Sequence, residues 1–507
     1  TVGAINMQTG AQEQAKIKLA YDITPALQAD TLYARWRNDY CVFNQTLLHD
    51  AATGAEVWKG TGPTAVNIDG TRYTLPTMAP QKGSEEHEQF GGRIRTRNKT
   101  GWNYSVQAST YQVLTNTIRQ SNVSDPLAGG VQKGTDTVGD GTGWRTFEWQ
   151  STYTPPAGEA HALTFGYHQN DYTLKNRVFN LDNWNNAATR TGESSNYFGK
   201  TEVKALYAQD AWRFKPDWTA TAGLRLERFR AYDGSQFDAA ATSKPQVDYA
   251  GRSESGVSPK LSLAHMLNNE WLVRGSLARG VRFPTVSELF QGARSGTAII
   301  INDPDMKPET SDAKEWSFIR EAGDSSIRVS LFEDDIKNAI FQQQQIVGAT
   351  TVTTVQNVKR VRTRGVEAVY QGTDVLISGF DLQASIALTK AKTLENPAFP
   401  ASEGKNWPRV PRVRASLLGS YRTGPWLGAL GVRHEGHQYG TLDNSDINPD
   451  AVGAVSSFTV ADVRLGYQVG KRGKLAMGID NLTDRRYYVG PHPYPGRTIY
   501  AEARFAY

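Results

Sequence analysis

Two groups of cationic and aromatic residues stand out as candidates for binding chemistry. Their members are Arg279, Arg282, Phe290 and Arg294 in the first group, and Arg433, His437 and Tyr439 in the second. Guanidinium groups hold anions through paired hydrogen bonds, and aromatic faces stack on rings and cations. Each group borders or enters a long segment rich in Gly, Asn, Asp, Ser and Thr, so we expect loops to carry a site for a bulky anionic ligand. Any one of these residues, taken alone, is more simply a rim or solvated loop residue.

Catalytic and metal chemistry find little support in the sequence. His434 and His437 lie three residues apart, and on a strand such residues face opposite sides, so without a bulge they do not chelate a metal together. Five methionines and the single Cys41 offer few of the soft sulfur ligands that copper(I) prefers. The sequence shows no nucleophile elbow, zinc-protease motif or isolated carboxylate pair. We therefore expect no catalytic residues, no bound metal, no cofactor and no enzymatic activity.

The segments of the chain that would position these residues alternate apolar and polar side chains with the period of β-strands. In Lys474–Asp480, apolar side chains alternate with small or charged ones, and Thr498–Tyr507 repeats the pattern. Alternation with a period of two predicts a strand whose faces meet different environments. The polar set mixes Gly, Ala and charges, which make a poor dry core but a good wall for a wet lumen. This stretch predicts an all-β outer-membrane barrel or, taken by itself, a strand of a soluble sandwich.

Composition favours the barrel. The chain has 507 residues, a mean hydropathy of -0.52 and 39% hydrophobic residues. No run approaches the roughly 18 apolar residues that a spanning helix needs. A barrel strand needs only about 9–11 residues, half of them apolar, so such strands escape hydropathy analysis. The net charge of +5 is spread without a basic tail, so we expect no nucleic-acid partner.

Short turns and long loops alternate along the whole chain. Turn-forming residues mark nine short turns, at 24–26, 98–101, 155–158, 215–217, 268–269, 323–325, 371–379, 424–425 and 470–473. After the first, these turns recur about every 50–60 residues, which corresponds to two strands and one long loop. Short turns on one rim and long loops on the other are typical of an antiparallel outer-membrane barrel. No change of composition marks a boundary, so we expect residues 1–507 to form one domain.

The alternation also predicts which side chains face lipid. They are Leu224, Leu226, Leu475, Ile479, Ile499 and Phe505. Arg360, Arg362 and Arg364 alternate onto a single face, which is either the lumen wall or the outside, where lipopolysaccharide phosphates would meet them. A bulge at Gly365 would change their side. We expect lipopolysaccharide and outer-membrane lipid among the partners of the chain.

Ordered motifs along this strand scaffold resemble those of one family. They are an arginine-proline box (Arg282-Phe283-Pro284 with Glu288-Leu289-Phe290), a Pro-Glu box (Asp303 to Ser311, with Asp for Asn and Met for Leu), Asn357 to Glu367, Val460-Ala461-Asp462, and Asn481-Leu482-Thr483-Asp484 with Tyr487 and Pro495-Gly496-Arg497-Thr498 before a terminal aromatic strand. Together they resemble siderophore-type TonB-dependent outer-membrane receptors over essentially the whole chain.

The resemblance implies a function and partners. Such receptors lie in the outer membrane of Gram-negative bacteria and take up scarce, bulky nutrients, energised by the TonB-ExbB-ExbD complex. We therefore expect a ferric siderophore or similar iron chelate as ligand, held by the cationic and aromatic groups at the barrel mouth. Cobalamin and haem are the alternative ligands, although haem receptors of this kind carry a histidine between the two boxes and none lies between Pro284 and Pro308. A passive porin-like barrel and an outer-membrane enzyme are the alternatives from other classes.

The family also has a globular plug and an N-terminal TonB box, and the sequence shows neither, since strand material begins at Gln12–Ile23. Two strands around each of the nine turns, and one more at Gly496–Tyr507, give nineteen strands. Transporters of this type have about 22 strands, and single-chain bacterial barrels close with an even number. We therefore expect about 19 of 22 strands, with the plug and the first strands missing and the energising complex meeting the missing plug segment. The edges at Gln12–Ile23 and Gly496–Tyr507 are then unpaired, and this fragment alone would not insert into a membrane.

Overall fold

The computed structural model describes residues 4–46, 49–57, 65–68, 71–74, 79–123, 130–241, 244–295, 298–347, 350–450, 454–489 and 492–506. Nineteen of its strands have eight residues or more. They are β1 (Ala4–Thr24), β2 (Leu27–Thr46), β5 (Gln81–Thr96), β6 (Gly101–Ser121), β8 (Gly143–Thr154), β9 (His161–Leu181), β10 (Arg190–Lys215), β11 (Trp218–Asp238), β13 (Arg252–Met266), β14 (Trp271–Arg282), β17 (Glu309–Ala322), β18 (Ser325–Val347), β19 (Thr350–Gly372), β20 (Phe380–Glu395), β21 (Val413–Thr423), β22 (Trp426–Glu435), β23 (Phe458–Val469), β24 (Gly473–Asp480) and β27 (Thr498–Phe505).

The remaining elements are short. They are β3 (Ala65–Ile68), β4 (Thr71–Thr74), β7 (Gly134–Val138), β12 (Gln246–Tyr249), β15 (Ala293–Ser295), β16 (Ala298–Ile301), β25 (Tyr488–Val489), β26 (His492–Pro493), α1 (Val286–Phe290) and two 3-10 turns, Ala187–Thr189 and Pro400–Ser402. No helix in the described part of the chain is long and apolar enough to span a membrane.

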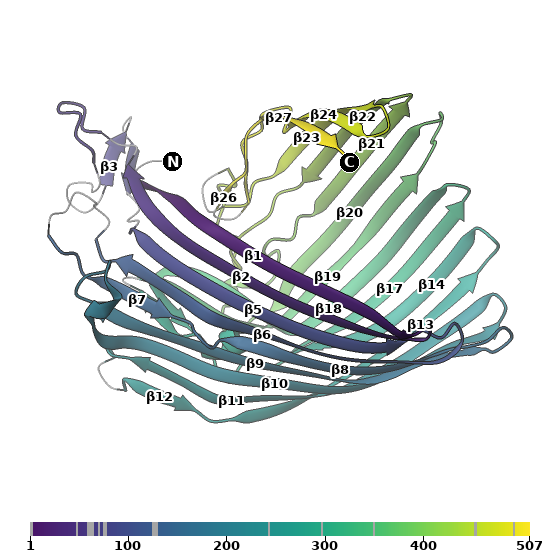
Figure 1. The fold of residues 1–507 in the computed structure, drawn as a ribbon, viewed down its shortest axis with the longest axis horizontal. Helices are drawn as coiled ribbons and strands as arrows, with labels where there is room; N and C mark the ends of the chain where they lie inside the picture. Colours follow the sequence, from purple (N-terminus) through teal and green to yellow (C-terminus); the bar gives the residue numbers. More distant parts are fainter. Residues whose placement is uncertain are drawn as a thin grey trace.

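Each long strand pairs antiparallel with the next long strand, so the chain forms one continuous meander. The ladder runs without interruption from the β1–β2 pair to the β24–β27 pair. Among the described residues, β1 and β27 do not pair with each other, and the two ends of the curved sheet lie apart in Figure 1. The predicted all-β fold and the count of nineteen strands are confirmed, although β1 begins earlier than the predicted Gln12 and β27 begins at Thr498 rather than Gly496.

The nine predicted short turns all connect neighbouring long strands. The backbone conformation of these turns explains why many of them contain glycine. Positive φ angles between 52° and 94°, which other residues rarely adopt, occur at Gly101, Gly158, Gly323, Gly424 and Gly470. The longer connections carry the short strands, and β3, β7 and β12 lie on the same side of the molecule, apart from one another, in Figure 1. The prediction of short turns on one rim and long loops on the other is confirmed.

The sheet has one apolar face with exposed side chains. Leu224 and Leu226 are 44% and 48% exposed, whereas Arg225 between them is only partly exposed. The other predicted lipid-facing residues follow the same alternation, with Ile499 70% and Phe505 62% exposed. No second sheet covers this face in the described residues, so the soluble sandwich is wrong for this chain. We call this face the outer face and the opposite one the inner face.

Loops fold back against the inner face and create the small cores of the molecule. One core joins Phe229 and Ala231 of β11 to Leu289, Phe290 and Met306 of the connection between β14 and β17. A second core joins Val358 and Val361 of β19 to Leu442 in the loop after β22. Phe229 and Ala231 alternate with Arg228 and Arg230, which are exposed on the outer face. The loops therefore narrow the enclosed space at the rim opposite the short turns.

Candidate functional site

The arginine-proline box forms an anchor on the inner face. Phe283 stacks on Phe229 with ring centroids 5.0 Å apart and planes 4° apart. Thr285 caps α1, and its backbone N–H donates to Glu288 in return, which completes a capping box. Glu288 also pairs with Arg282. The motif therefore fixes where the chain leaves β14 and turns inward.

Phe290 ends α1 in a notch between two glycines. A Cβ atom added to Gly199 would lie 2.2 Å from the Phe290 ring, and one added to Gly234 would lie 2.3 Å from it. Only glycine leaves room for the ring at both positions. Phe290 is 4% exposed, so it anchors the loop and does not face the mouth.

The Pro-Glu box ties the same loop to the next hairpin. Lys307 N–H donates to Asn357 Oδ1 at 2.7 Å, and Asn357 Nδ2 donates back to the Lys307 carbonyl at 3.0 Å. Glu309 accepts a hydrogen bond from the Ile340 N–H at 2.8 Å, and Met306 is fully buried. The box and the segment beginning at Asn357 are therefore two halves of one clamp.

The motifs near the end of the chain form a second clamp. Asn481, whose φ is 51°, donates its N–H to Asp462 Oδ1 at 2.8 Å and exchanges two hydrogen bonds with Arg485 at 2.9 Å. Tyr487 stacks on Phe458 with centroids 4.2 Å apart. Burial raises the pKa of the Tyr487 phenol, and the charge of the neighbouring Arg433 partly offsets this shift. These motif residues hold the last hairpin in place.

The first predicted binding group is dispersed in the structure. Arg279 shares the outer face with the exposed Leu277 and pairs with Asp312 at 2.7 Å, so it does not point into the mouth. Arg282 is engaged by Glu288, and Phe290 is buried. Arg294 lies on β15, and its side chain is outside the described atoms. These positions favour structural roles for Arg282 and Phe290.

The second predicted group stays at the rim. Arg433 lies on the inner face of β22 and pairs with Asp462 at 3.2 Å, with half of its side chain exposed. His437 and Tyr439 pack edge to face with centroids 4.5 Å apart. In the described part of the chain, no hydrogen bond, ion pair or ring contact joins this group to the first one. No group of three or more His, Cys, Asp or Glu side chains there could hold a metal.

The structure reveals an aromatic group that sequence reasoning missed. Its members lie on five strands of the inner face and are Trp36, His87, Tyr111, Trp144 and Tyr172. Tyr111 and Trp144 stack with centroids 4.1 Å apart and planes 7° apart, and Trp144 is 38% exposed. His87 bonds to the Tyr111 hydroxyl through Nδ1, whereas its buried Nε2 has no hydrogen-bond partner among the described residues. We call these five residues the aromatic wall.

A family model described as "TonB dependent receptor-like, beta-barrel" matches residues 20–482. The chain belongs to this family. It is therefore the β-barrel of an outer-membrane receptor, and its apolar outer face contacts lipid while its inner face lines the lumen. The family is one of transport receptors, not of enzymes.

Individual relatives resemble the receptor over part of their length. The iron-regulated outer membrane virulence protein of Vibrio cholerae is 29% identical over 38% of this chain and 25% of its own length. The ferric enterobactin receptor PirA of Pseudomonas aeruginosa is 23% identical over 59% of this chain and 41% of its own length. The ferripyoverdine receptor of Pseudomonas aeruginosa has the same fold, with a TM-score of 0.65 at 14% identity over 98% of this chain and 65% of that one. The receptor chain thus spans less than half the length of these curated relatives.

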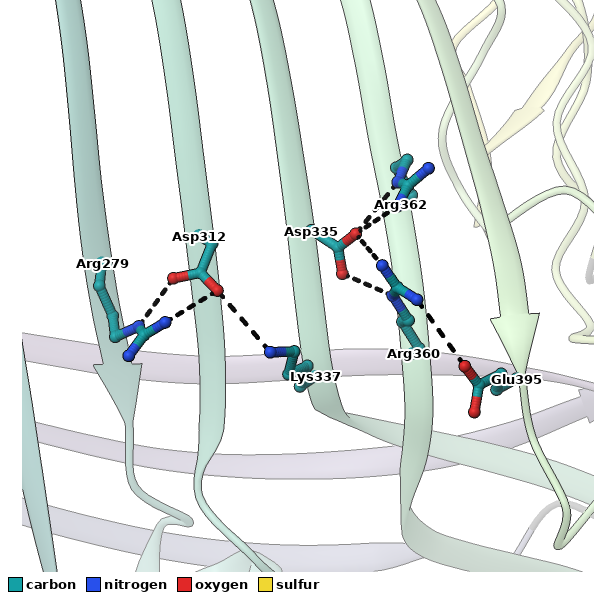
Figure 2. Close-up of polar contacts among 7 residues, drawn as sticks. All are labelled: Arg279, Asp312, Asp335, Lys337, Arg360, Arg362 and Glu395. Carbon is teal, nitrogen blue, oxygen red and sulfur yellow. Dashed lines mark hydrogen bonds and ion pairs between the residues drawn. The ribbon is translucent and has the colours of Figure 1, made fainter.

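The outer face of the receptor carries a charged patch on β14 to β20. In Figure 2, Asp335 accepts hydrogen bonds from Arg360 at 2.7 and 2.8 Å and from Arg362 at 2.7 and 3.0 Å. Arg360 also lies 3.8 Å from Glu395. Asp335 follows the exposed Leu331 by four residues on the same face, so the arginines of β19 lie outside and not in the lumen.

A second carboxylate organises the other half of this patch. Asp312 accepts two hydrogen bonds from Arg279, at 2.7 and 3.1 Å, and lies 3.9 Å from Lys337 (Figure 2). Residues of the patch, together with Leu261 and Leu277, line a depression of about 650 Å³. Charged side chains thus lie directly beside apolar side chains on the outer face.

Proposed function

We propose that the receptor binds a ferric siderophore or similar iron chelate at its outer mouth and takes it up in a TonB-dependent manner. The observation that carries this proposal is the aromatic wall. Tyr111 and Trp144 present stacked rings on the lumen side, at the end of β8 that is remote from its short turn. One of the relatives is a ferric enterobactin receptor, which supports an iron chelate as the ligand.

The chemistry of the wall suits a large chelate with aryl or other flat groups. Flat rings stack on Trp and Tyr faces without ordering flexible side chains, and offset stacking adds about 0.5–1.5 kcal/mol beyond area burial. Arg433 supplies a cation on the lumen side of β22, held by Asp462 but half exposed. An anionic chelate with aryl groups needs a cation for its charge and aromatic faces for its rings, and both face the same lumen here.

Binding to the wall is tested by titrating the purified receptor with ferric siderophores, haem and cobalamin while following tryptophan fluorescence. We expect saturable binding of a ferric siderophore, and we expect W144A to weaken it about tenfold, which corresponds to the loss of one stacking contact. W102A is the matched control, because Trp102 lies near a short turn and packs on Tyr153 and Phe165. Tight binding of haem or cobalamin without a siderophore response would overturn the ligand proposed.

We infer that residues 1–507 act as one barrel domain in this function. The uninterrupted ladder from β1 to β27 supports this inference, because no group of strands stands apart from it. Energised transport is expected to require the TonB-ExbB-ExbD complex. Uptake that persists when the proton gradient of the inner membrane is collapsed would favour a passive porin-like barrel instead.

A further inference from the structure

The aromatic wall contains a pair of donor atoms that ring stacking does not use. The Tyr111 hydroxyl on β6 and Nδ1 of His87 on β5 form a hydrogen bond with each other. Imidazole nitrogen and phenolate oxygen are both ligands of iron in proteins. Neighbouring strands therefore bring an oxygen donor and a nitrogen donor together on the lumen side of the sheet.

Neighbouring rings hold both side chains in place. Tyr111 stacks on Trp144 with planes 7° apart and meets His87 edge to face with centroids 5.5 Å apart. The His87 ring also meets Trp36 edge to face, with centroids 5.0 Å apart. Because packing already restricts these side chains, binding a metal costs little of their conformational entropy. The donor pair is thus preorganised.

The hydrogen bond between the two side chains indicates which lone pairs are available. The phenol hydrogen of Tyr111 needs an acceptor, and among the described residues Nδ1 of His87 is its hydrogen-bond partner. Nδ1 then carries a lone pair, and the imidazole proton is on Nε2, which is buried and has no partner in the described part of the chain. A metal that replaces the phenol hydrogen meets one oxygen donor and one nitrogen donor.

The charge beside the pair favours a cation. The β2–β5 register places His87 opposite Trp36 and Glu85 opposite Asn38, so Glu85 shares the inner face with His87. Asn38 Nδ2 donates to Glu85 Oε2 at 3.1 Å, which holds the carboxylate at this level of the lumen. A negative charge here attracts a ferric ion and repels a chelate of high negative charge.

We propose that Tyr111 and His87 coordinate the iron of a ferric chelate whose own donor atoms leave adjacent positions of the octahedron open. The inference rests on the proposed function, because the same aromatic wall binds the chelate. In this step the water molecules in the open positions leave, the Tyr111 phenol releases its proton to solvent, and iron–oxygen and iron–nitrogen bonds form. The iron stays ferric. The wall thereby selects open chelates over chelates that fill the octahedron themselves.

The test compares ferric bis-catecholate, which leaves adjacent positions open, with ferric tris-catecholate, which leaves none, since both present the same rings. The purified intact receptor is titrated with each chelate while tryptophan fluorescence is followed. We expect Y111F to lower the ratio of the two affinities about tenfold against the open chelate, and H87F to lower it similarly. Phenylalanine keeps an aromatic ring at either position and removes the donor atom, and the ratio cancels effects common to both chelates.

A second readout identifies the bond itself. Resonance Raman bands of an iron-bound tyrosinate shift when the receptor is labelled with ring-deuterated tyrosine, whereas bands of the catecholate do not. The matched control is Y370F, because Tyr370 lies beside a short turn, where its hydroxyl is 3.3 Å from the Ser325 hydroxyl. This variant should keep both the affinity ratio and the label-sensitive bands.

The inference fails if the bound bis-catecholate shows no label-sensitive band, or if Y111F and H87F leave the affinity ratio unchanged. Binding of both chelates in that case would leave the proposed function standing, with stacking as the mode of binding. If neither chelate binds the unmodified receptor, the inference and the proposed binding of aryl chelates both fail.

Discussion

Phe290 shows how a single residue of a family motif acts through packing. Its ring fills the notch between Gly199 and Gly234, and this contact holds the connection from β14 to β17 against the lumen wall. An aromatic residue at this position suggests ligand binding, but the burial of Phe290 shows that it supports the structure of the loop. Aromatic residues of the exposed wall, such as Trp144, are the ones free to meet a ligand.

The notch gives a prediction at the residue scale. In G234A the new methyl group would overlap the Phe290 ring, so we expect the variant to lose about 1–3 kcal/mol of stability, as overpacked sites do. Urea unfolding followed by tryptophan fluorescence measures this loss. G280A is the control, because a Cβ at Gly280 meets nothing within 4 Å. Equal stability of the two variants would contradict the packing role of Phe290.

Faces of individual strands were harder to predict than the strands themselves. The turns follow from local backbone preferences, for example the positive φ of Gly158 and Gly470, so the sequence alone locates them. The face of Arg360 does not follow from local preferences in this way, because the β19–β20 ladder shifts its register between Arg360 and Val361. On the neighbouring strand β18, Asn338 has a φ of 54° and interrupts the alternation between Lys337 and Ala339. Such a bulge leaves no clear signal in residue types.

The aromatic wall was not predictable for a different reason. His87 and Tyr111 are 24 residues apart, and they meet because the β5–β6 ladder pairs His87 with Val113 and Gln89 with Tyr111, which places both side chains on one face. Register is set by the whole hairpin and not by the residues that it brings together. Of the predicted site, the structure brings His437 and Tyr439 into contact, and a binding role for them and for Arg433 stays a prediction.

The strand β11 gives a prediction at the scale of elements. Leu224 lies on the outer face, so L224R should cost about 2–4 kcal/mol if the residue lies near the membrane midplane. Thr221 lies on the inner face of the same strand, and T221R should cost much less because its side chain meets the wet lumen. Unfolding of both variants in lipid vesicles provides the comparison. A larger loss for T221R would reverse the assignment of faces.

At the scale of the whole molecule, the sheet is continuous, but within the described residues its two end strands do not pair with each other. The free edges of β1 and β27 present backbone N–H and C=O groups that lipid cannot satisfy. We therefore expect a polypeptide of residues 1–507 alone not to insert as a stable barrel. Refolding into lipid vesicles, followed by protease digestion and electrophoresis of unheated samples, tests this. A protease-resistant, heat-modifiable species would show that these edges find hydrogen-bond partners within residues 1–507.

We propose energised uptake of a ferric siderophore that binds to the aromatic wall. Its most direct test is uptake of radioactive iron, supplied as ferric siderophore, by cells that depend on this receptor. We expect saturable uptake that stops when the inner-membrane proton gradient is collapsed, weakens in W144A and persists in W102A. Uptake that rises linearly with concentration, ignores the gradient and is equal in both variants would contradict it.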